Sequence, residues 1–259
     1  MLLENHAEFK LSITKALGDQ LSAALMDLRP APLTMENIQL LRPLPGVYQL
    51  YKGEELVYVG KADTSLPQRI EKHFRKISGR RNISLAEMAF TCLYVDEDFG
   101  AVAPERLLIN KHRGQGEVPW NYNGFGNNDP GKRRDTTEVD ADHFDRAYPI
   151  DLEYKCAELW QFVSGSGTVS LADLLSATKR ALPYVFRYQA SSAFEAIHVA
   201  ESYECATADE ILRTVASHLP DMWQITALPG YLIMYPKVEE YPSAQRYYTA
   251  SGVLEVSGH

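Results

Sequence analysis

Hydrophobic residues first repeat at helical spacing and then alternate with polar ones. Between residues 5 and 29 the apolar positions follow a helical period, which predicts an amphipathic helix that ends before Arg29-Pro30. Residues 46–51 and 55–59 are short runs of strand-forming residues on either side of a Lys52-Gly53-Glu54 turn. Such a pattern predicts a β-hairpin.

After the hairpin the pattern predicts a helix, a strand and a second helix. Pro67 suits the first turn of a helix that runs to about Ile77, with Ser65 or Thr64 as its cap. Residues 88–95 form an apolar run of strand length, and Pro104 opens a helix over 105–113. This order of elements indicates a small α+β domain.

The rest of the chain begins with a loop rich in Gly, Asn and Pro, residues 114–135, and long loops in compact domains are usually functional. A new series of elements follows. Ser170 is expected to cap a helix over 171–181, and Thr207 to open a second helix with a capping box. Strand-like runs between and after these helices predict a second small α+β domain. The expected organisation is an N-terminal helical arm, 1–43, a first domain, 44–150, and a C-terminal domain, 151–259, for which dimerisation or docking is the expected role.

Charge is distributed unevenly along the chain. The formal net charge is −8, and residues 151–259 hold 13 acidic against 7 basic residues. From Lys61 to Arg81, by contrast, seven basic residues stand against two acidic ones. A local basic stripe of this kind is what phosphate binding requires.

Cysteine usage and hydropathy bound the cellular context. Cys92, Cys156 and Cys205 are far apart and form no CxxC pair, so neither a zinc site nor a disulfide framework is indicated. No apolar run approaches the length of a membrane span, and the first residues lack the pattern of a signal peptide. The expected location is the cytoplasm.

Five residues in order carry the strongest signal. Tyr48 lies in Gly46-Val47-Tyr48, Tyr58 in Tyr58-Val59-Gly60, and Arg69, Glu105 and Asn121 follow. Residues 44–123 thereby resemble the GIY-YIG nuclease superfamily, with Val47 and Val59 replacing the isoleucines of the name motif. The resemblance implies a central three-stranded antiparallel sheet flanked by helices, and a phosphodiesterase that uses one divalent ion, Mg²⁺ or Mn²⁺, per active site.

The residue types suit that chemistry. Glu105 is the expected metal ligand, because Mg²⁺ prefers a hard carboxylate and leaves other positions to water and phosphate. Arg69 offers a charged planar fork to phosphate oxygens. Tyr48 and Tyr58 are expected to orient the attacking water. An unshifted tyrosine has a pKa near 10, so a base role for either requires the metal or Arg69 to lower it.

His73 lies four residues after Arg69, on the same helix face, and is expected to hydrogen-bond the Tyr48 hydroxyl or the water. The Arg-x3-His spacing and the loop from Asn123 to Asp135 resemble the type II restriction endonuclease branch. That branch implies a homodimer cutting both strands of a palindromic duplex, with a DNA methyltransferase as a partner in the same system. Which of Tyr48, Tyr58 and His73 takes the proton stays open.

Contacts with double-stranded DNA are expected from the basic stripe and from the loop. Arginine commonly reads guanine and Asn or Gln reads adenine, so the loop is where base readout is expected. The candidates are Lys61, Arg75, Lys76, Asn127, Asn128, Lys132, Arg133 and Arg134.

Each candidate also has a simpler interpretation. Tyr48 and Tyr58 taken alone fit half-buried strand aromatics, and a lone Arg69 fits a solvated helix face. Glu105 suits the first turn of a helix in any protein, and Asn123 is close enough to compete with Asn121. At the level of function, the alternatives are a GIY-YIG nuclease of repair, mobile elements or general phage defence, and a catalytically silent DNA-binding module.

Overall fold

The chain divides into two units that are described separately. The computed structural model describes residues 13–95, 107–109, 118–127, 131–157, 159, 167–200 and 206–256. The N-terminal unit takes its described residues from Met1–Lys72 and Ala86–Tyr122, and the C-terminal unit from His73–Leu85 and Asn123–His259. The predicted limits at residues 43 and 150 stay predictions.

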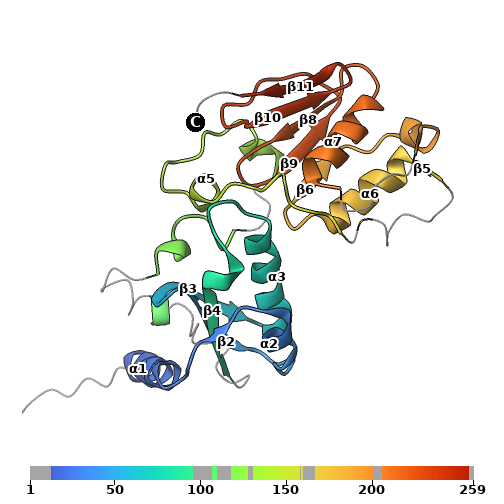
Figure 1. Ribbon diagram of the computed structural model, residues 1–259. Coiled ribbons are helices and arrows are strands. Elements are labelled where there is room, and N and C mark those ends of the chain that lie inside the picture. The colour runs from blue at the N-terminus through green and yellow to red at the C-terminus, as the bar shows by residue number, and fades with distance from the viewer. Residues whose placement is uncertain are drawn as a thin grey trace, which may run out of the picture. The chain divides into compact units, whose positions relative to one another are not determined.

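The N-terminal unit is built on an antiparallel sheet (Figure 1). In chain order its elements are α1 (Ile13–Met26), β1 (Ala31–Pro32), α2 (Met35–Gln39), β2 (Gly46–Lys52), β3 (Glu55–Ala62), α3 (Leu66–Ser78), η1 (Leu85–Glu87), β4 (Met88–Tyr94) and η3 (Pro119–Asn121). Helices α3 and η1 reach the division between the units, and α3 continues into the C-terminal unit.

The sheet order among the described residues is β1-β4-β2-β3, with antiparallel pairing throughout. The expected three-stranded sheet is present as β4, β2 and β3. The two-residue β1 adds a fourth strand beside β4, which the hydrophobic pattern did not predict because two residues carry no period. A register shift between Leu50 and Tyr51 interrupts the hairpin.

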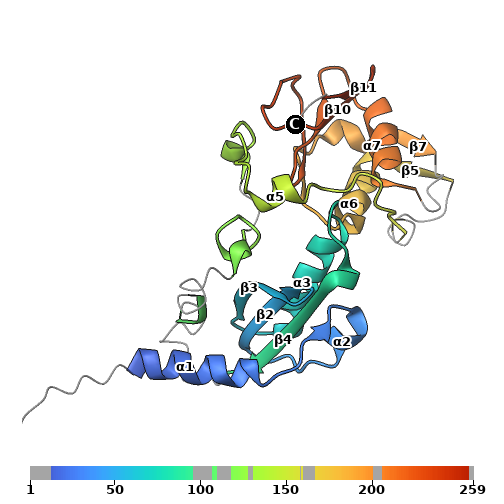
Figure 2. The same cartoon turned by 60° about the vertical axis from the view of Figure 1, so that its left-hand side comes forward.

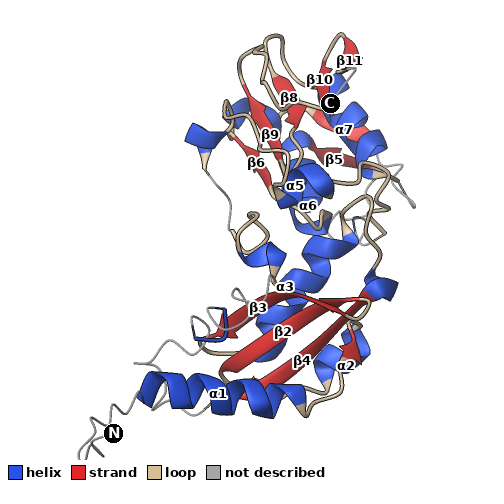
Figure 3. Ribbon diagram, turned by 90° about the vertical axis from the view of Figure 1, so that its left-hand side faces the viewer, coloured by secondary structure: helices blue, strands red, loops and turns tan. Residues whose placement is uncertain are grey.

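Each face of this sheet is covered by a helix (Figures 2 and 3). Val47 and Val59 point to one face, where they form a core with Leu21 and Leu25 of α1. Side chains alternate along a strand, so the neighbouring Tyr48 points to the opposite face. That face meets the start of α3, which fixes the side of the sheet on which a site can form.

The C-terminal unit contains a five-stranded sheet in the order β11-β10-β8-β9-β6, in which only the β6–β9 pair is parallel. A two-stranded pair, β5 with β7, stands apart. The described elements are η4 (Lys132–Arg134), α5 (Phe144–Ala147), β5 (Thr168–Ser170), α6 (Leu171–Ala181), β6 (Phe186–Tyr188), η6 (Ser192–Glu195), β7 (His198–Ala200), α7 (Ala208–Ser217), β8 (Gln224–Ala227), β9 (Leu232–Tyr235), β10 (Arg246–Thr249) and β11 (Gly252–Glu255).

The two faces of this larger sheet bury different residues. On one face Ile225 and Met234 pack with helices α6 and α7 in the main core of the unit (Figure 1). The other face carries a tyrosine-rich cluster that includes Tyr231, Ile233 and Tyr235. The second face meets the turn η4, where Tyr231 and Tyr235 donate hydrogen bonds to Asp135.

The α+β class is confirmed, and several predicted elements occur at the expected positions. Ser170 accepts from the Asp173 N–H at the start of α6, and Thr207 and Glu210 form the predicted capping box of α7. The second hairpin strand runs to Ala62 and is longer than predicted. Strands β10 and β11 were not predicted, and only residues 107–109 of the predicted 105–113 helix are described. In the described part of the chain, no helix is long and apolar enough to cross a membrane.

Candidate active site

Tyr48 and Tyr58 lie on neighbouring strands and point to the same face of the sheet. Tyr48 in β2 pairs with Gly60 in β3, and Tyr58 pairs with Leu50. The ring centroids of the two tyrosines are 6.1 Å apart. Tyr48 is fully buried, and 4% of Tyr58 is exposed. The hairpin therefore brings both predicted tyrosines together beneath α3.

Glycine is required at two positions around Tyr48. A Cβ added at Gly60 would lie 2.2 Å from both Cζ and Oη of Tyr48, so the ring occupies the space of a side chain. A Cβ at Gly46 would lie 2.3 Å from the Leu93 carbonyl oxygen and 2.8 Å from Leu66 Cδ1. Both positions require glycine because neighbouring atoms come close to the backbone there. Each glycine is paired within a strand, so a turn conformation is not the reason.

Arg69 reaches Tyr48 from the first turns of α3. Its Nε donates to the Tyr48 hydroxyl oxygen at 3.1 Å. Burial lowers the pKa of Arg69, but the Tyr48 and Tyr58 hydroxyls raise it by more, so the pKa of Arg69 lies above its ordinary value. The guanidinium therefore stays charged, and a cationic donor stabilises negative charge on the phenolic oxygen that accepts its hydrogen bond.

Asn121 in η3 binds the backbone of the second hairpin strand. Its Oδ1 accepts from the Val59 N–H at 2.9 Å, and its Nδ2 donates to the Val59 carbonyl at 2.8 Å. Among the described strands β3 lies at the edge of the sheet, where backbone groups have no neighbouring strand to pair with. Asn121 thus fixes the peptide between Tyr58 and Gly60, and its expected role in catalysis stays a prediction.

His73 follows Arg69 by one turn of α3, as expected, and belongs to the C-terminal unit. Its ring is 5% exposed and stacks on Phe125 with 4.9 Å between centroids. Phe125 is part of the predicted loop, which makes its turn at Gly124 with φ +91°. The stacking ties the middle of α3 to that loop, and a contact of His73 with the attacking water stays a prediction.

A polar cleft of about 320 Å³ opens at the start of α3. Its lining includes Lys61, Ser65, Gln68, Arg69 and Lys72. Asp63 also lines it and forms an ion pair with Lys61 at 2.8 Å, which leaves the cleft with an excess of positive charge. The N-terminal end of a helix adds further positive potential. An anionic group is therefore the ligand that this cleft favours.

Two of the expected DNA contacts already have acceptors within the protein. Arg75 donates to the carbonyl oxygens of Arg180 at 2.9 Å and Leu182 at 3.3 Å. Lys76 donates to the Phe125 carbonyl at 2.7 Å, and its Nζ lies 5.2 Å from the Phe125 ring centroid. Both side chains follow His73 in α3 and hold parts of the C-terminal unit together.

Of the other expected DNA contacts, Lys61 lines the cleft and the rest lie in the loop. Lys132, Arg133 and Arg134 form the short helix η4, and all three are exposed. Asn127 is also exposed, while Asn128 lies outside the described residues. The basic side chains therefore have access to a ligand, and their contact with DNA stays a prediction.

The expected metal ligand, Glu105, also lies outside the described residues. Within the described ranges, no three His, Cys, Asp or Glu residues gather in a way that could hold a metal ion. A single-carboxylate site needs no such group, since a hard divalent ion completes its shell with water and phosphate oxygens. The cationic cleft beside Arg69 would hold that phosphate, so the described residues fit an ion of this kind.

Some residues of the site were not predicted. The sequence marked Gly60 only as part of a motif, and the register now shows that it makes room for Tyr48. Gln68 and Lys72 line the cleft, and the signal that could have identified them is helical spacing, because Lys72 follows Arg69 by three residues and Gln68 by four.

A tyrosine hairpin, an arginine on the following helix and an asparagine bound to the second hairpin strand together define the GIY-YIG class of domain. Residues 50–157, which are 108 of the 259 residues, match the family model described as the Eco29kI GIY-YIG domain. The matched family is a GIY-YIG family of type II restriction endonucleases. The match includes Tyr58, Arg69 and Glu105 and begins two residues after Tyr48. None of the curated proteins matches the chain.

Proposed function

We propose that the protein is a divalent-metal-dependent restriction endonuclease that cuts double-stranded DNA at a specific sequence. The observation that carries the proposal is the Arg69–Tyr48 hydrogen bond, which places a charged guanidinium against two buried tyrosines on one face of the sheet. A domain that served only as a scaffold would have no need to bury these polar groups together.

Arg69 would bind the phosphate under attack. Tyr48 accepts from Nε, the Tyr58 hydroxyl also interacts with Arg69, and a guanidinium has five N–H donors in all. The other donors can face phosphate oxygens and stabilise the charge that grows there in the transition state. Tyr48 is fully buried beside Arg69 and would act through it, by fixing the direction of the guanidinium.

Tyr58 would orient the attacking water. It keeps a small exposed fraction, whereas Tyr48 has none, so Tyr58 is the tyrosine closer to solvent. Asn121 would act as a positioning residue, because it holds the Val59 peptide that directly follows Tyr58. His73, four residues beyond Arg69, would be a second acceptor for the proton of the water.

The cleft at the start of α3 would receive the DNA backbone on its way to Arg69. Lys61 and Lys72 would neutralise a backbone phosphate there, and Gln68 would donate a hydrogen bond. Arg75 and Lys76 have no part in this proposal, because their side chains already bind carbonyl groups of the protein.

Glu105 would hold the divalent ion, Mg²⁺ or Mn²⁺, one per active site. Such an ion neutralises charge on the phosphate and increases the acidity of bound water. The match to the Eco29kI domain supports a restriction-type enzyme. A homodimer would bring two active sites to the two strands of a palindromic duplex, and a DNA methyltransferase in the same system would protect the host's own sites.

The test is cleavage of plasmid and phage DNA by the purified protein with Mg²⁺ or Mn²⁺, followed by sequencing of the ends. We expect discrete fragments that share a palindrome, and no cleavage in EDTA. Glu105→Ala should abolish cleavage yet bind DNA as the wild type does. The matched control is Glu55→Ala, an exposed hairpin residue that should cut normally.

Other outcomes would favour the alternatives. Nicks that depend on DNA structure rather than sequence would indicate a repair or mobile-element nuclease. DNA binding without cleavage under any metal would indicate a silent binding module. Cleavage that continues in EDTA, or full activity of Glu105→Ala, would contradict the proposed mechanism.

A further inference from the structure

A buried carboxylate ends the basic turn η4. Asp135 is the C-cap of that turn and is only 2% exposed. Its Oδ1 accepts from Tyr231 Oη at 2.9 Å, and its Oδ2 accepts from Tyr235 Oη at 3.2 Å. Arg187 Nη1 donates to both oxygens, at 3.0 and 2.8 Å. Both carboxylate oxygens are therefore hydrogen-bonded inside the C-terminal unit.

The partners of Asp135 come from one face of the five-stranded sheet. Arg187 in β6 pairs with Ile233 in β9, and Ile233 belongs to the tyrosine-rich cluster with Tyr231 and Tyr235. Burial raises the pKa of both tyrosines, and Asp135 raises it further, so their hydroxyls remain protonated donors. A buried carboxylate with three such partners is held in one place.

The turn itself is fixed against this anchor. The Asp135 N–H donates to the Lys132 carbonyl at 3.3 Å, and the Arg134 N–H donates to the Gly131 carbonyl at 3.0 Å. Lys132 Nζ lies 4.5 Å from the Tyr235 ring centroid. Arg133 and Arg134 remain exposed on the anchored turn.

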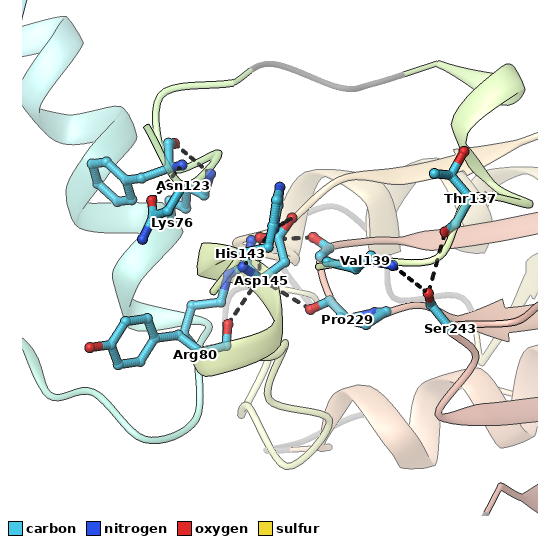
Figure 4. A network of polar contacts seen from close by, with 12 residues as sticks. Lys76, Arg80, Asn123, Thr137, Val139, His143, Asp145, Pro229 and Ser243 are labelled. Carbon is cyan, nitrogen blue, oxygen red and sulfur yellow. Dashed lines mark hydrogen bonds and ion pairs between the residues drawn. The ribbon is translucent and has the colours of Figure 1, made fainter. Parts of the chain in front are cut away.

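The chain after the turn is attached to the same unit at two further points (Figure 4). Ser243 Oγ donates to the Thr137 carbonyl at 3.3 Å and accepts from the Val139 N–H at 3.2 Å. Farther along, Asp145 forms an ion pair with the buried Arg80 at 2.9 Å. The segment that follows the basic turn is thus bound to the C-terminal unit at Thr137, Val139 and Asp145.

We propose that Asp135 is a positioning residue for DNA recognition and that the C-terminal sheet is the frame that presents Arg133 and Arg134 to the duplex. The inference rests on the proposed function, since the ligand of the turn is the DNA of that proposal. It gives residues 151–259 a role other than dimerisation or docking. The acidic charge of that region is then compatible with DNA binding. The arginines that contact DNA belong to the loop, and the sheet fixes their position without contacting DNA itself.

The decisive comparison is Asp135→Asn against Asp209→Asn. Asp209 is an equally suitable buried carboxylate in the same unit, where it accepts hydrogen bonds from Tyr248 and from two arginines, Arg213 and Arg246. Both variants lose a buried charge, but only Asp135 caps the basic turn. DNA affinity is measured by fluorescence anisotropy in EDTA, so the readout does not depend on cleavage.

We expect Asp135→Asn to weaken binding of cognate DNA about tenfold, the size of one good base contact. The slope of the logarithm of affinity against the logarithm of salt concentration should become shallower, by the amount that corresponds to the loss of about one to two phosphate contacts. Asp209→Asn should leave both quantities near wild type. Hydrogen exchange at residues 131–137 should accelerate in Asp135→Asn only, which tests the anchoring without any DNA.

A double-mutant cycle separates positioning from a general loss of structure. In an Arg133→Ala, Arg134→Ala background, Asp135→Asn should weaken binding no further, because the side chains that it positions are gone. An undiminished effect in that background, or equal effects of the two Asp→Asn changes on binding, would overturn the inference. If the wild type binds no DNA, the proposed function fails instead, and hydrogen exchange still reports on the anchor.

Discussion

The ring of Tyr48 fills the space that a side chain at Gly60 would need. The two residues pair across β2 and β3, and an added Cβ would lie 2.2 Å from the Tyr48 hydroxyl oxygen. Tyr48 in turn accepts from Arg69. A glycine in one strand therefore determines where a guanidinium on a helix can be placed.

Gly60→Ala should displace the Tyr48 ring and with it Arg69. Overpacking of a buried site usually costs about 1–3 kcal/mol of the free energy of unfolding, and we expect a larger relative loss in cleavage rate than in DNA affinity. Urea denaturation and single-turnover cleavage measure the two effects. Gly53→Asn is the control, because Gly53 has φ +59° in open space and asparagine tolerates that conformation. A fully active Gly60→Ala enzyme would show that the position of Tyr48 is unimportant.

The two tyrosines should respond differently to loss of the hydroxyl. Tyr58→Phe is expected to lower the cleavage rate at saturating DNA about 100-fold or more, the range for a group that handles a proton. Tyr48→Phe should lower it about tenfold, because only the direction of Arg69 is lost. Rate measurements at saturating DNA over a range of pH decide between them. The reverse order of effects would assign the water to Tyr48.

Asn121→Ala should leave the Val59 N–H and carbonyl without their side-chain partner at the sheet edge. We expect stability to fall by about 1–3 kcal/mol and the cleavage rate to fall with DNA affinity nearly unchanged. Asn121→Asp keeps the acceptor but loses the donor, so it should recover only part of the stability. Thermal unfolding and cleavage rates provide the measurements. Equal stability in all three proteins would mean that Asn121 does not position the strand.

Arg80 should be among the most sensitive residues for stability. Its side chain is 3% exposed, and it pairs with Asp145 and donates to the carbonyl oxygens of Tyr148 and Pro229. Breaking a buried ion pair from one side costs about 3–5 kcal/mol, which we expect for Arg80→Ala in urea denaturation. The neighbouring Arg81 is exposed, and Arg81→Ala should change stability by less than about 0.5 kcal/mol. Similar costs for the two would contradict the importance of the pair.

Asp209 should make the C-terminal unit sensitive to acid. Burial raises the pKa of Asp209, but hydrogen bonds from Arg213, Tyr248 and Arg246 lower it by more. The pKa of Asp209 therefore lies below its ordinary value. A carboxylate whose pKa is lower in the folded than in the unfolded state stabilises the fold at pH values above its unfolded pKa, which is near 4. That stabilisation is lost as the pH falls through the folded-state pKa. The free energy of unfolding should therefore decrease below about pH 4, and less steeply in Asp209→Asn. Parallel acid profiles would contradict this assignment.

The local sequence pattern was sufficient to predict the hairpin, the helix that carries Arg69 and the helix caps at Ser170 and Thr207. Each of these depends on residues that are close together in the sequence. The order Tyr48, Tyr58, Arg69 also predicted that these side chains meet, since a hairpin followed by a helix on its face leaves little choice. The partners of Asp135 could not be predicted. They lie 52 to 100 residues away in the chain, and only the pairing of β6 with β9 brings them to one face. The charge of Arg75 and Lys76 was visible in the sequence but their carbonyl acceptors were not, and their contact with DNA stays a prediction.

The contacts along the edge of β3 also limit how copies of the chain can associate. Asn121 occupies the outward N–H and carbonyl of Val59, and the Val118 N–H donates to the Leu56 carbonyl on the same edge at 3.3 Å. A strand from another molecule needs these groups to extend the sheet. If the chain forms the proposed dimer, the two copies would therefore not join by strand pairing along this part of β3.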